Sequence, residues 1–221
     1  MNEPKRPTIT DVHEPTRPSG QTAPEYRYVN PWRAIWYQPR LALHSALALR
    51  STLETWILSA FAGISLLFGW AAWGELGVEL SNGELLALIL LTGPFFGGVV
   101  LMLGGVLLRA GGWMLGGRAS PWHVRRALVW SSMPMLVGLP LWIIALALPA
   151  SASHITTTVY ATQAGLWGWA GLLSIIGLAE AHQISLVRAL LSWILAIALI
   201  VGGFMALFGG SALLITLLNK N

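Results

Sequence analysis

The chain has 221 residues, of which 55% are hydrophobic and 10% are charged, and it contains no cysteine. Because about a quarter of the residues in a soluble domain are usually charged, this composition predicts an integral membrane protein, and the lack of cysteine excludes disulfide bonds and thiolate chemistry. The formal net charge of +4 is typical of membrane proteins with basic cytoplasmic loops, so we expect no nucleic-acid partner.

Residues 1–29 form the first segment, which is rich in proline and poor in aliphatic side chains. Such a segment buries too little apolar surface to offset the entropy that it would lose on ordering. We therefore predict a disordered cytoplasmic tail.

Residues 30–54 begin with NPWRAIWYQPR, which places Trp32 and Trp36 beside Arg33. Aromatic and basic side chains in this mixture are typical of the boundary between lipid headgroups and water. After Pro39, apolar residues recur at helical spacing: Ala42, Ala46, Leu49 and Leu53. Polar residues fall off this stripe: Arg40, His44 and Ser51. We therefore predict an amphipathic interfacial helix that leads into the first span.

Five apolar stretches follow, and each is long enough to cross a hydrocarbon core that needs about 20 helical residues. They are Thr55–Trp73, a stretch that starts near Leu85, Ala127–Leu148, Val159–Ala179 and Ala189–Leu218. We therefore predict an all-α polytopic protein with a five-span membrane domain over residues 55–218.

The second apolar stretch, residues 85–117, is too long for one upright crossing and too short for two. One kinked or overrunning helix is the simpler interpretation. A re-entrant element near Gly93-Pro94 is the alternative.

The distribution of charge predicts the orientation of the spans. With the N-terminus inside, all of the 13 lysines and arginines except Lys220 lie on the inner side. The first outer loop carries Glu75, Glu79 and Glu84 and no basic residue. Because basic loops stay in the cytoplasm, we predict an N-in, C-out topology.

Two charged residues lie near the inner ends of the predicted spans, Arg109 in the second and Glu180 in the fourth. They are expected at the same depth, so they either pair or extend separately into the headgroup region. A metal site built from His123, Glu180 and His182 is not expected, because a spacing of two residues places Glu180 and His182 on different helix faces.

Paired glycines recur in the second and fifth spans. The second span has Gly104-Gly105 and Gly111-Gly112, and the fifth has Gly202-Gly203 and Gly209-Gly210. A seven-residue repeat returns to nearly the same helix face, so each span gains a smooth stripe that another helix can approach closely. The two stripes lie at opposite depths, so each is expected to meet a different span. General tolerance of glycine in membrane helices is the alternative.

Three segments follow one another along the chain. They are the entry segment NPWRAIWYQPR, the turn GGRAS (Gly116, Gly117 and Arg118 with the two residues after them) and the span that begins ALVWSSMPMLVGLP. Together with the five-span plan, they resemble the Yip family of Ypt/Rab-interacting membrane proteins, in its bacterial branch, over residues 30–218. The resemblance implies a multi-pass protein of the bacterial cytoplasmic (inner) membrane without an assigned reaction. Eukaryotic members associate with prenylated Rab GTPases, but their Asp-Leu-Tyr-Gly-Pro type motif is not evident here, so no GTPase-binding residue is carried over.

No phosphate-binding or nucleophile motif is present, so we expect neither an enzyme nor a cofactor. The expected function is a membrane scaffold or adaptor that recruits a protein partner, contacts anionic lipid or organises the bilayer through its cytoplasmic face. The candidate structural or interaction residues are Trp32, Arg33, Trp36, Arg109, Gly116, Gly117, Arg118 and Glu180. The alternative is a small transporter or channel component for a neutral or lipid-like solute, since the spans carry no ionisable residue at mid-depth for coupling to ions.

Overall fold

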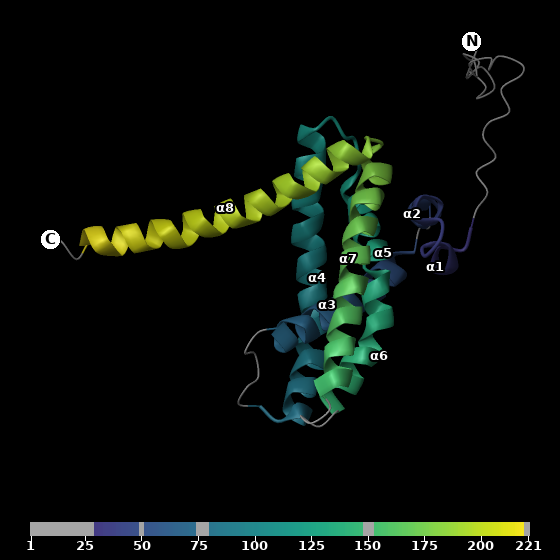
Figure 1. Ribbon diagram of the computed structural model, residues 1–221. Helices are drawn as coiled ribbons and strands as arrows, with labels where there is room; N and C mark the ends of the chain where they lie inside the picture. Colours follow the sequence, from purple (N-terminus) through teal and green to yellow (C-terminus); the bar gives the residue numbers. More distant parts are fainter. Residues whose placement is uncertain (1–28, 49–50, 74–79, 148–152, 219–221) are drawn as a thin grey trace, which may run out of the picture.

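The computed structural model describes residues 29–48, 51–73, 80–147 and 153–218, and over these ranges the chain is helical, with no strand (Figure 1). The eight helices of the described ranges are α1 (Pro31–Ala34), α2 (Pro39–Ala48), α3 (Thr52–Trp73), α4 (Asn82–Met114), α5 (Pro121–Ser131), α6 (Met133–Ala147), α7 (Ser153–His182) and α8 (Leu186–Leu218). The predicted all-α class is therefore confirmed. The predicted disordered tail lies outside the described residues except for Val29.

Four helical segments are long and apolar enough to cross a membrane, and they support a multi-pass membrane protein. They are Thr52–Ala72, Asn82–Met114, Pro121–Ala147 and His154–His182. The fifth predicted span falls in α8, whose described side chains form a shorter apolar helix, Leu186–Gly202. From its start beside α4 and α7, α8 runs away from the other helices to one side (Figure 1). The fifth crossing and the outer C-terminus therefore stay predictions.

Helix α4 is continuous over 33 residues, so the single-helix interpretation of the second apolar stretch is confirmed and the re-entrant alternative is not. It begins with a capping box, in which the Ser81 side chain accepts a hydrogen bond from the Glu84 N–H and the Glu84 carboxylate accepts from the Ser81 N–H. At about 1.5 Å per residue the helix is about 50 Å long, which exceeds the hydrocarbon core of about 30 Å. If the hydrocarbon core begins at the first turn of α4, the last turns of the helix, which carry Arg109, lie beyond the other side of that core.

The third predicted span consists of two helices, because α5 ends at Ser131 and α6 begins at Met133. Pro134 lies in the first turn of α6, where its missing N–H needs no partner, and it disfavours a continuous helix through the residues before it. The helical segment also begins earlier than predicted, at Pro121 rather than Ala127. Pro140 lies inside α6.

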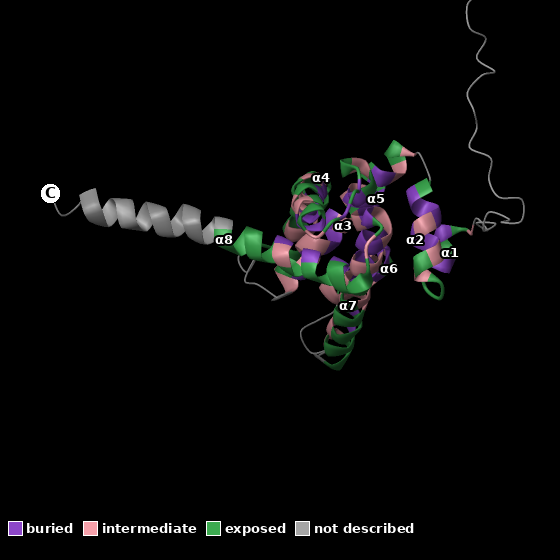
Figure 2. Cartoon of the chain, turned by 90° about the horizontal axis from the view of Figure 1, so that it is seen from above, coloured by how far each residue is buried: buried purple, intermediate pink, exposed green. Residues whose placement is uncertain are grey.

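Helices α1 and α2 pack against α5 and α7, so residues 30–48 differ from the predicted surface helix. Ile35, Ala42 and Leu43 are fully buried in a cluster that includes Trp130 of α5 and Leu173 of α7. Both α1 and α2 carry buried residues, drawn in purple (Figure 2). The division at Pro39 is confirmed, since α2 begins there. Leu53 does not continue the predicted stripe, since it belongs to α3 and is 70% exposed. Leu49 lies outside the described ranges.

The closest helix crossing joins α3 to α4 through glycine. A Cβ atom at Gly63 would lie less than 3.0 Å from the backbone of Gly93 and Gly97, and one at Gly97 would overlap the carbonyl of Ser59. These residues form two small-x-x-x-small patterns that face each other, an arrangement that allows close backbone packing in lipid.

Candidate functional site

Most of the sequence-predicted site residues lie at one end of the bundle. We call this region the cap and define it as α1, α2, the last turns of α4 with the turn to α5 (residues 109–120), the first residues of α5, and the segment from the end of α7 to the start of α8 (residues 180–188). The cap is held together by contacts between these segments, such as the hydrogen bond from the Arg118 N–H to the His182 carbonyl at 3.4 Å.

Gly116 and Gly117 end α4 in a way that requires glycine. Gly116 has φ +87°, which side chains rarely tolerate. The Gly117 N–H donates to the Gly112 carbonyl at 2.8 Å and the Gly116 N–H donates to the Trp113 carbonyl at 3.1 Å. This is the Schellman pattern, which satisfies the last carbonyl groups of a helix. The sequence GGRAS is thus a helix stop that turns the chain toward α5.

Gly112 and Gly117 also make room for His182. A Cβ atom at either glycine would lie less than 3.0 Å from the imidazole ring. The ring is buried, with His182 2% exposed, and its Nδ1 accepts a hydrogen bond from the Ala119 N–H at 3.3 Å. His182 therefore joins the end of α7 to the turn after α4, and the ring takes a structural position.

Glu180 is ion-paired with α2. Its carboxylate binds the Arg40 guanidinium through one oxygen and lies 3.7 Å from His44 Nδ1 through the other. Of the two alternatives for Glu180, the pair with Arg109 is not formed: the ion pairs of Glu180 among the described residues are with Arg40 and His44 of α2. His123 interacts with Ser120, so His123, Glu180 and His182 each have a different neighbour.

Arg125 and Arg126 turn into the fold, which the sequence did not indicate. Arg126 is 6% exposed, donates from Nη1 to the Leu47 carbonyl at 3.3 Å and lies over the Trp122 ring at 5.5 Å. Leu47 is in the last turn of α2, where a cation offsets the negative end of the helix dipole. Arg125 packs its side chain against Gly105. These arginines stabilise the cap rather than extend its exposed basic surface.

The exposed charged and aromatic groups of the cap surround two hollows. The first, of about 390 Å³, is lined by Arg109, Trp113, Gly116, Gly117, Arg118 and Ala119. The second, of about 350 Å³, includes Arg118, His123, Glu180 and His44 in its wall. Arg118 borders both hollows. Trp113 is 73% exposed, which gives the first hollow an aromatic edge.

The other predicted residues of the entry segment lie on α1 and just after it. Arg33 is exposed, and Trp32 is 44% exposed with its ring 5.3 Å from the Trp130 ring in an edge-to-face contact. Trp36 is 39% exposed. The tryptophans thus combine one packed face with one open face, as is typical of residues at a membrane boundary.

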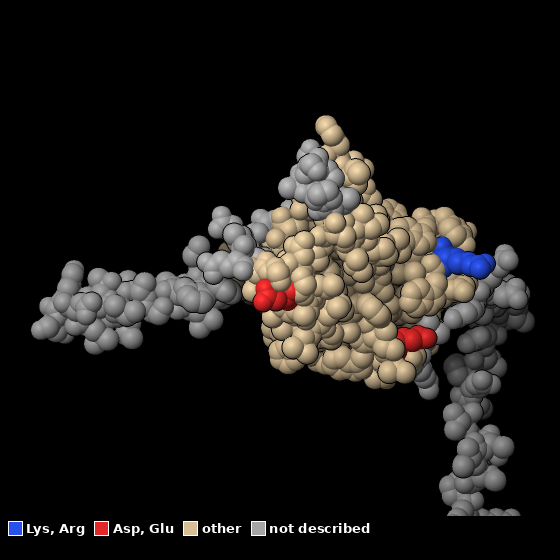
Figure 3. Space-filling view, turned by 90° about the horizontal axis from the view of Figure 1, so that it is seen from below, with Lys and Arg blue, Asp and Glu red and all other residues tan. Residues whose placement is uncertain are grey.

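The molecule is mostly uncharged when it is seen from below, with scattered acidic and basic groups among the described residues (Figure 3). Glu84, which caps the start of α4, is exposed at the end opposite the cap. Exposed arginines are therefore a feature of the cap, where Arg33, Arg40, Arg109, Arg118 and Arg188 are all exposed.

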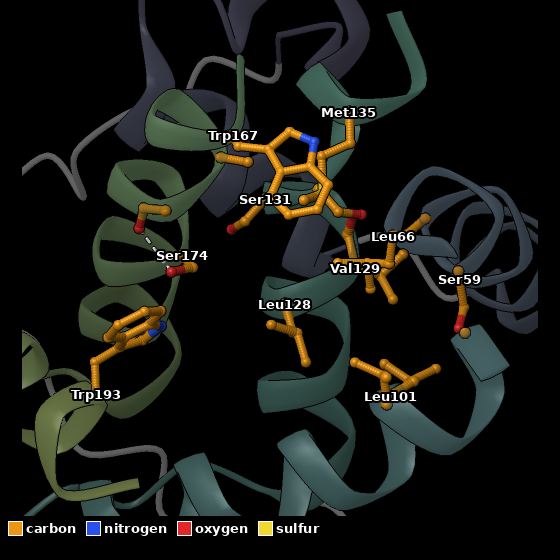
Figure 4. A pocket seen from close by; sticks show the side chains of 17 residues that line it. Ser59, Leu66, Leu101, Leu128, Val129, Ser131, Met135, Trp167, Ser174 and Trp193 are labelled. Carbon is orange, nitrogen blue, oxygen red and sulfur yellow. Dashed lines mark hydrogen bonds between the residues drawn. The ribbon is translucent and has the colours of Figure 1, made fainter. Parts of the chain in front are cut away.

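A further hollow lies inside the bundle, with a volume of about 450 Å³. Its walls come from α3, α4, α5, α6, α7 and the first part of α8, and they are mostly apolar (Figure 4). Sequence reasoning did not find this cavity, because it depends on how six helices meet.

Gln163 is a buried polar residue that sequence reasoning also missed. It is fully buried in α7 and donates a hydrogen bond from its side-chain amide to the Gly138 carbonyl of α6. A glutamine in the middle of an apolar span is itself a signal, because a polar group in lipid needs a partner in another helix.

The exposed arginines of the cap are suited to binding anionic groups. Arginine stays protonated at neutral pH and cannot act as a general base, but its planar set of donors fits carboxylate and phosphate groups. No family model matches the chain, and the comparisons with curated proteins and with solved structures gave no match either.

Proposed function

We propose that the protein is a non-enzymatic membrane scaffold of the cytoplasmic (inner) membrane, which recruits an acidic protein partner through the cap. The observation that carries this proposal is the first hollow, where Arg109 and Arg118 are exposed beside the exposed ring of Trp113. A carboxylate that enters this hollow can accept charge-assisted hydrogen bonds from either guanidinium.

The local charge balance supports an anionic partner. Glu180 is the acidic residue in the wall of the neighbouring hollow, and Arg40 and His44 already bind it. Its charge is therefore offset before any partner arrives, and the positive field of Arg109 and Arg118 is left available. Exposed tryptophan and arginine are also the residue types most enriched in the energetic centres of protein interfaces.

The proposal includes the orientation of the chain. A cap on the cytoplasmic side agrees with the rule that basic loops stay inside, and it places the N-terminus inside. With α8 as a fifth span, the C-terminus is outside. The resemblance of residues 30–218 to the Yip family supports the same plan, since that family has a cytosolic N-terminus.

A crosslinking experiment in living cells tests the scaffold function. A photoreactive amino acid at Trp113 should capture a defined protein, and Arg109→Gln combined with Arg118→Gln should abolish that adduct because the anchoring cations are lost. The matched control is Arg188→Gln, which removes an exposed arginine of α8 outside both hollows. Adducts to lipid alone, or a protein adduct that survives the double substitution, would count against the proposal.

Transport of a neutral or lipid-like solute is the alternative, and the cavity of about 450 Å³ inside the bundle favours it. A transporter should keep its activity when the two cap arginines are neutralised. Solute flux in liposomes made with the double variant, together with no specific protein adduct, would therefore favour transport over the scaffold.

A further inference from the structure

We propose that the cavity inside the bundle holds one acyl chain of a membrane phospholipid. The cavity lies among the four helical segments that are long and apolar enough to span a membrane, so lipid tails surround it. Its volume of about 450 Å³ falls in the range of ordinary ligand sites, about 300–1,000 Å³. Water is an unfavourable occupant of an apolar cavity of this kind, whereas hydrocarbon fits it.

Small residues form parts of the cavity wall on two sides. Gly97 of α4 and Gly63 of α3 line one side, and Ala170 and Gly171 of α7 line the other. A Cβ atom at Gly171 would meet no described atom within 4 Å, so this part of the wall borders open space. Larger side chains bound the remainder, with Trp167 and Trp193 on the side of α7 and α8 and Leu101 and Leu128 on the side of α4 and α5 (Figure 4).

The serines of the wall do not make the cavity polar. Ser59 is 2% exposed, and its hydroxyl makes no hydrogen bond to a described residue. Two other serines of the wall are satisfied, since Ser131 donates to the Ala127 carbonyl and Ser174 to the Gly171 carbonyl. The Ser59 hydroxyl has almost no accessible surface, and the other two hydroxyls are bonded within their own helices, so these serines leave the wall suited to a hydrocarbon chain.

The first turns of helix α8 form part of the cavity wall, and the rest of the helix leaves the bundle. Trp193 belongs to the wall, whereas Ile197, Ile200 and Val201 are exposed, so the following turns of α8 do not cover the cavity. A lipid chain can therefore enter from the side. Near Trp193, Ser192 of α8 donates to the Leu108 carbonyl of α4, so this side of the cavity is closed by a contact between α8 and α4.

Substitution of Gly171 separates this inference from a general effect on folding. Gly171→Leu fills the cavity from a position with open space, and Gly171→Ala fills it in part. The matched control is Gly168→Leu, one turn earlier on α7, where a Cβ atom also meets no described atom within 4 Å but the residue does not line the cavity. Both leucine variants remove a helix glycine, so both gain helix propensity equally.

The measurement is phospholipid retained by the full chain after purification in mild detergent, counted by native mass spectrometry and by lipid extraction. The unsubstituted protein and Gly168→Leu should each keep one phospholipid. Gly171→Leu should retain at most about a tenth of the phospholipid that the unsubstituted protein retains, because overpacking disfavours the bound chain. Gly171→Ala should retain an intermediate amount. Equal retention in all four proteins, or no bound phospholipid in any of them, would overturn the inference. Neither outcome bears on capture of a protein by the cap.

Discussion

Glu180 and His182 are two positions apart, yet their side chains meet different helices: Glu180 binds α2, and His182 packs against the end of α4. The spacing alone predicts that the two side chains point apart, and this is confirmed. It could not predict the partner of Glu180, because Arg40 lies 140 positions earlier in the chain and is brought close by the docking of α2. Gly112 was identified from its pairing with Gly111, but the reason for it is the imidazole ring that it accommodates.

The Arg40–Glu180 pair should show energetic coupling in a double-mutant cycle. Arg40→Glu and Glu180→Arg should each lower the melting temperature in detergent, since each places like charges together, and the double reversal should recover most of the loss. Arg40 is largely exposed, so we expect a coupling of no more than about 1 kcal/mol. Arg109→Glu is the control, and it should not couple with Glu180→Arg. Additive losses from Arg40→Glu and Glu180→Arg would show that the pair contributes nothing.

The contact between Gly112 and His182 predicts a specific rescue. Gly112→Ala should destabilise the protein by about 1–3 kcal/mol, because the added methyl overlaps the ring. Combining it with His182→Ala should cost less than the sum of the two single changes, since the smaller side chain makes room. Gly83→Ala is the control in the first turn of the same helix, where the added atom meets nothing within 4 Å. Thermal unfolding measures all four proteins, and an additive double variant would contradict the contact.

At the scale of helices, Pro39 is a local signal that predicted a boundary, since α2 begins there. The capping box of Ser81 and Glu84 begins α4 ahead of the predicted start near Leu85. The apolar stretches predicted the four helical segments that are long and apolar enough to cross a membrane. The docking of α1 and α2 was not predictable, because an apolar face that suits lipid also suits the side of another helix. The break between α5 and α6 falls close to Pro134, but no local rule placed it at Ser132.

The glycine stripe predicted for the second span meets other helices, whereas the one predicted for the fifth span does not within the described residues. Gly105 and Gly111 do meet other helices, through Arg125 of α5 and Ser192 of α8. At Gly202, by contrast, an added Cβ atom would meet no described atom within 4 Å, and Gly209-Gly210 lies beyond the described side chains. Among the described residues, Gly202 therefore meets no other span, contrary to what the glycine stripe of the fifth span predicts.

The α3–α4 crossing predicts that Gly97, unlike Gly202, does not tolerate a larger side chain. Gly97→Leu should prevent close packing of the two helices and lower the yield of folded protein severely, because an added Cβ atom already overlaps the Ser59 carbonyl. Gly202→Leu should leave thermal stability within about 0.5 kcal/mol of the unsubstituted protein, as for most surface changes. Size-exclusion chromatography and thermal unfolding in detergent compare the two, and equal tolerance would contradict the crossing.

At the scale of the whole molecule, composition was enough to predict a helical membrane protein, but it did not predict the distribution of arginines between core and surface. Arg125 and Arg126 turn inward, so a count of basic residues overstates the exposed charge of the cap. Arg109 and Arg118 remain as the exposed pair beside the first hollow. The inward arginines are distinguished from the exposed ones by their contacts: Arg126 binds Leu47 and Trp122, and Arg125 packs against Gly105. Such contacts are not visible in the sequence.

The scaffold proposal requires the cap to face the cytoplasm, and single-cysteine labelling tests that directly because the chain has no cysteine of its own. Gln183→Cys lies in the cap and Gly83→Cys at the opposite end, and both positions are exposed. In intact cells, a membrane-impermeant maleimide should label Gly83→Cys, and it should label Gln183→Cys only after the membrane is opened. Labelling of Gln183→Cys from outside, with Gly83→Cys protected, would place the basic cap outside and contradict the proposal.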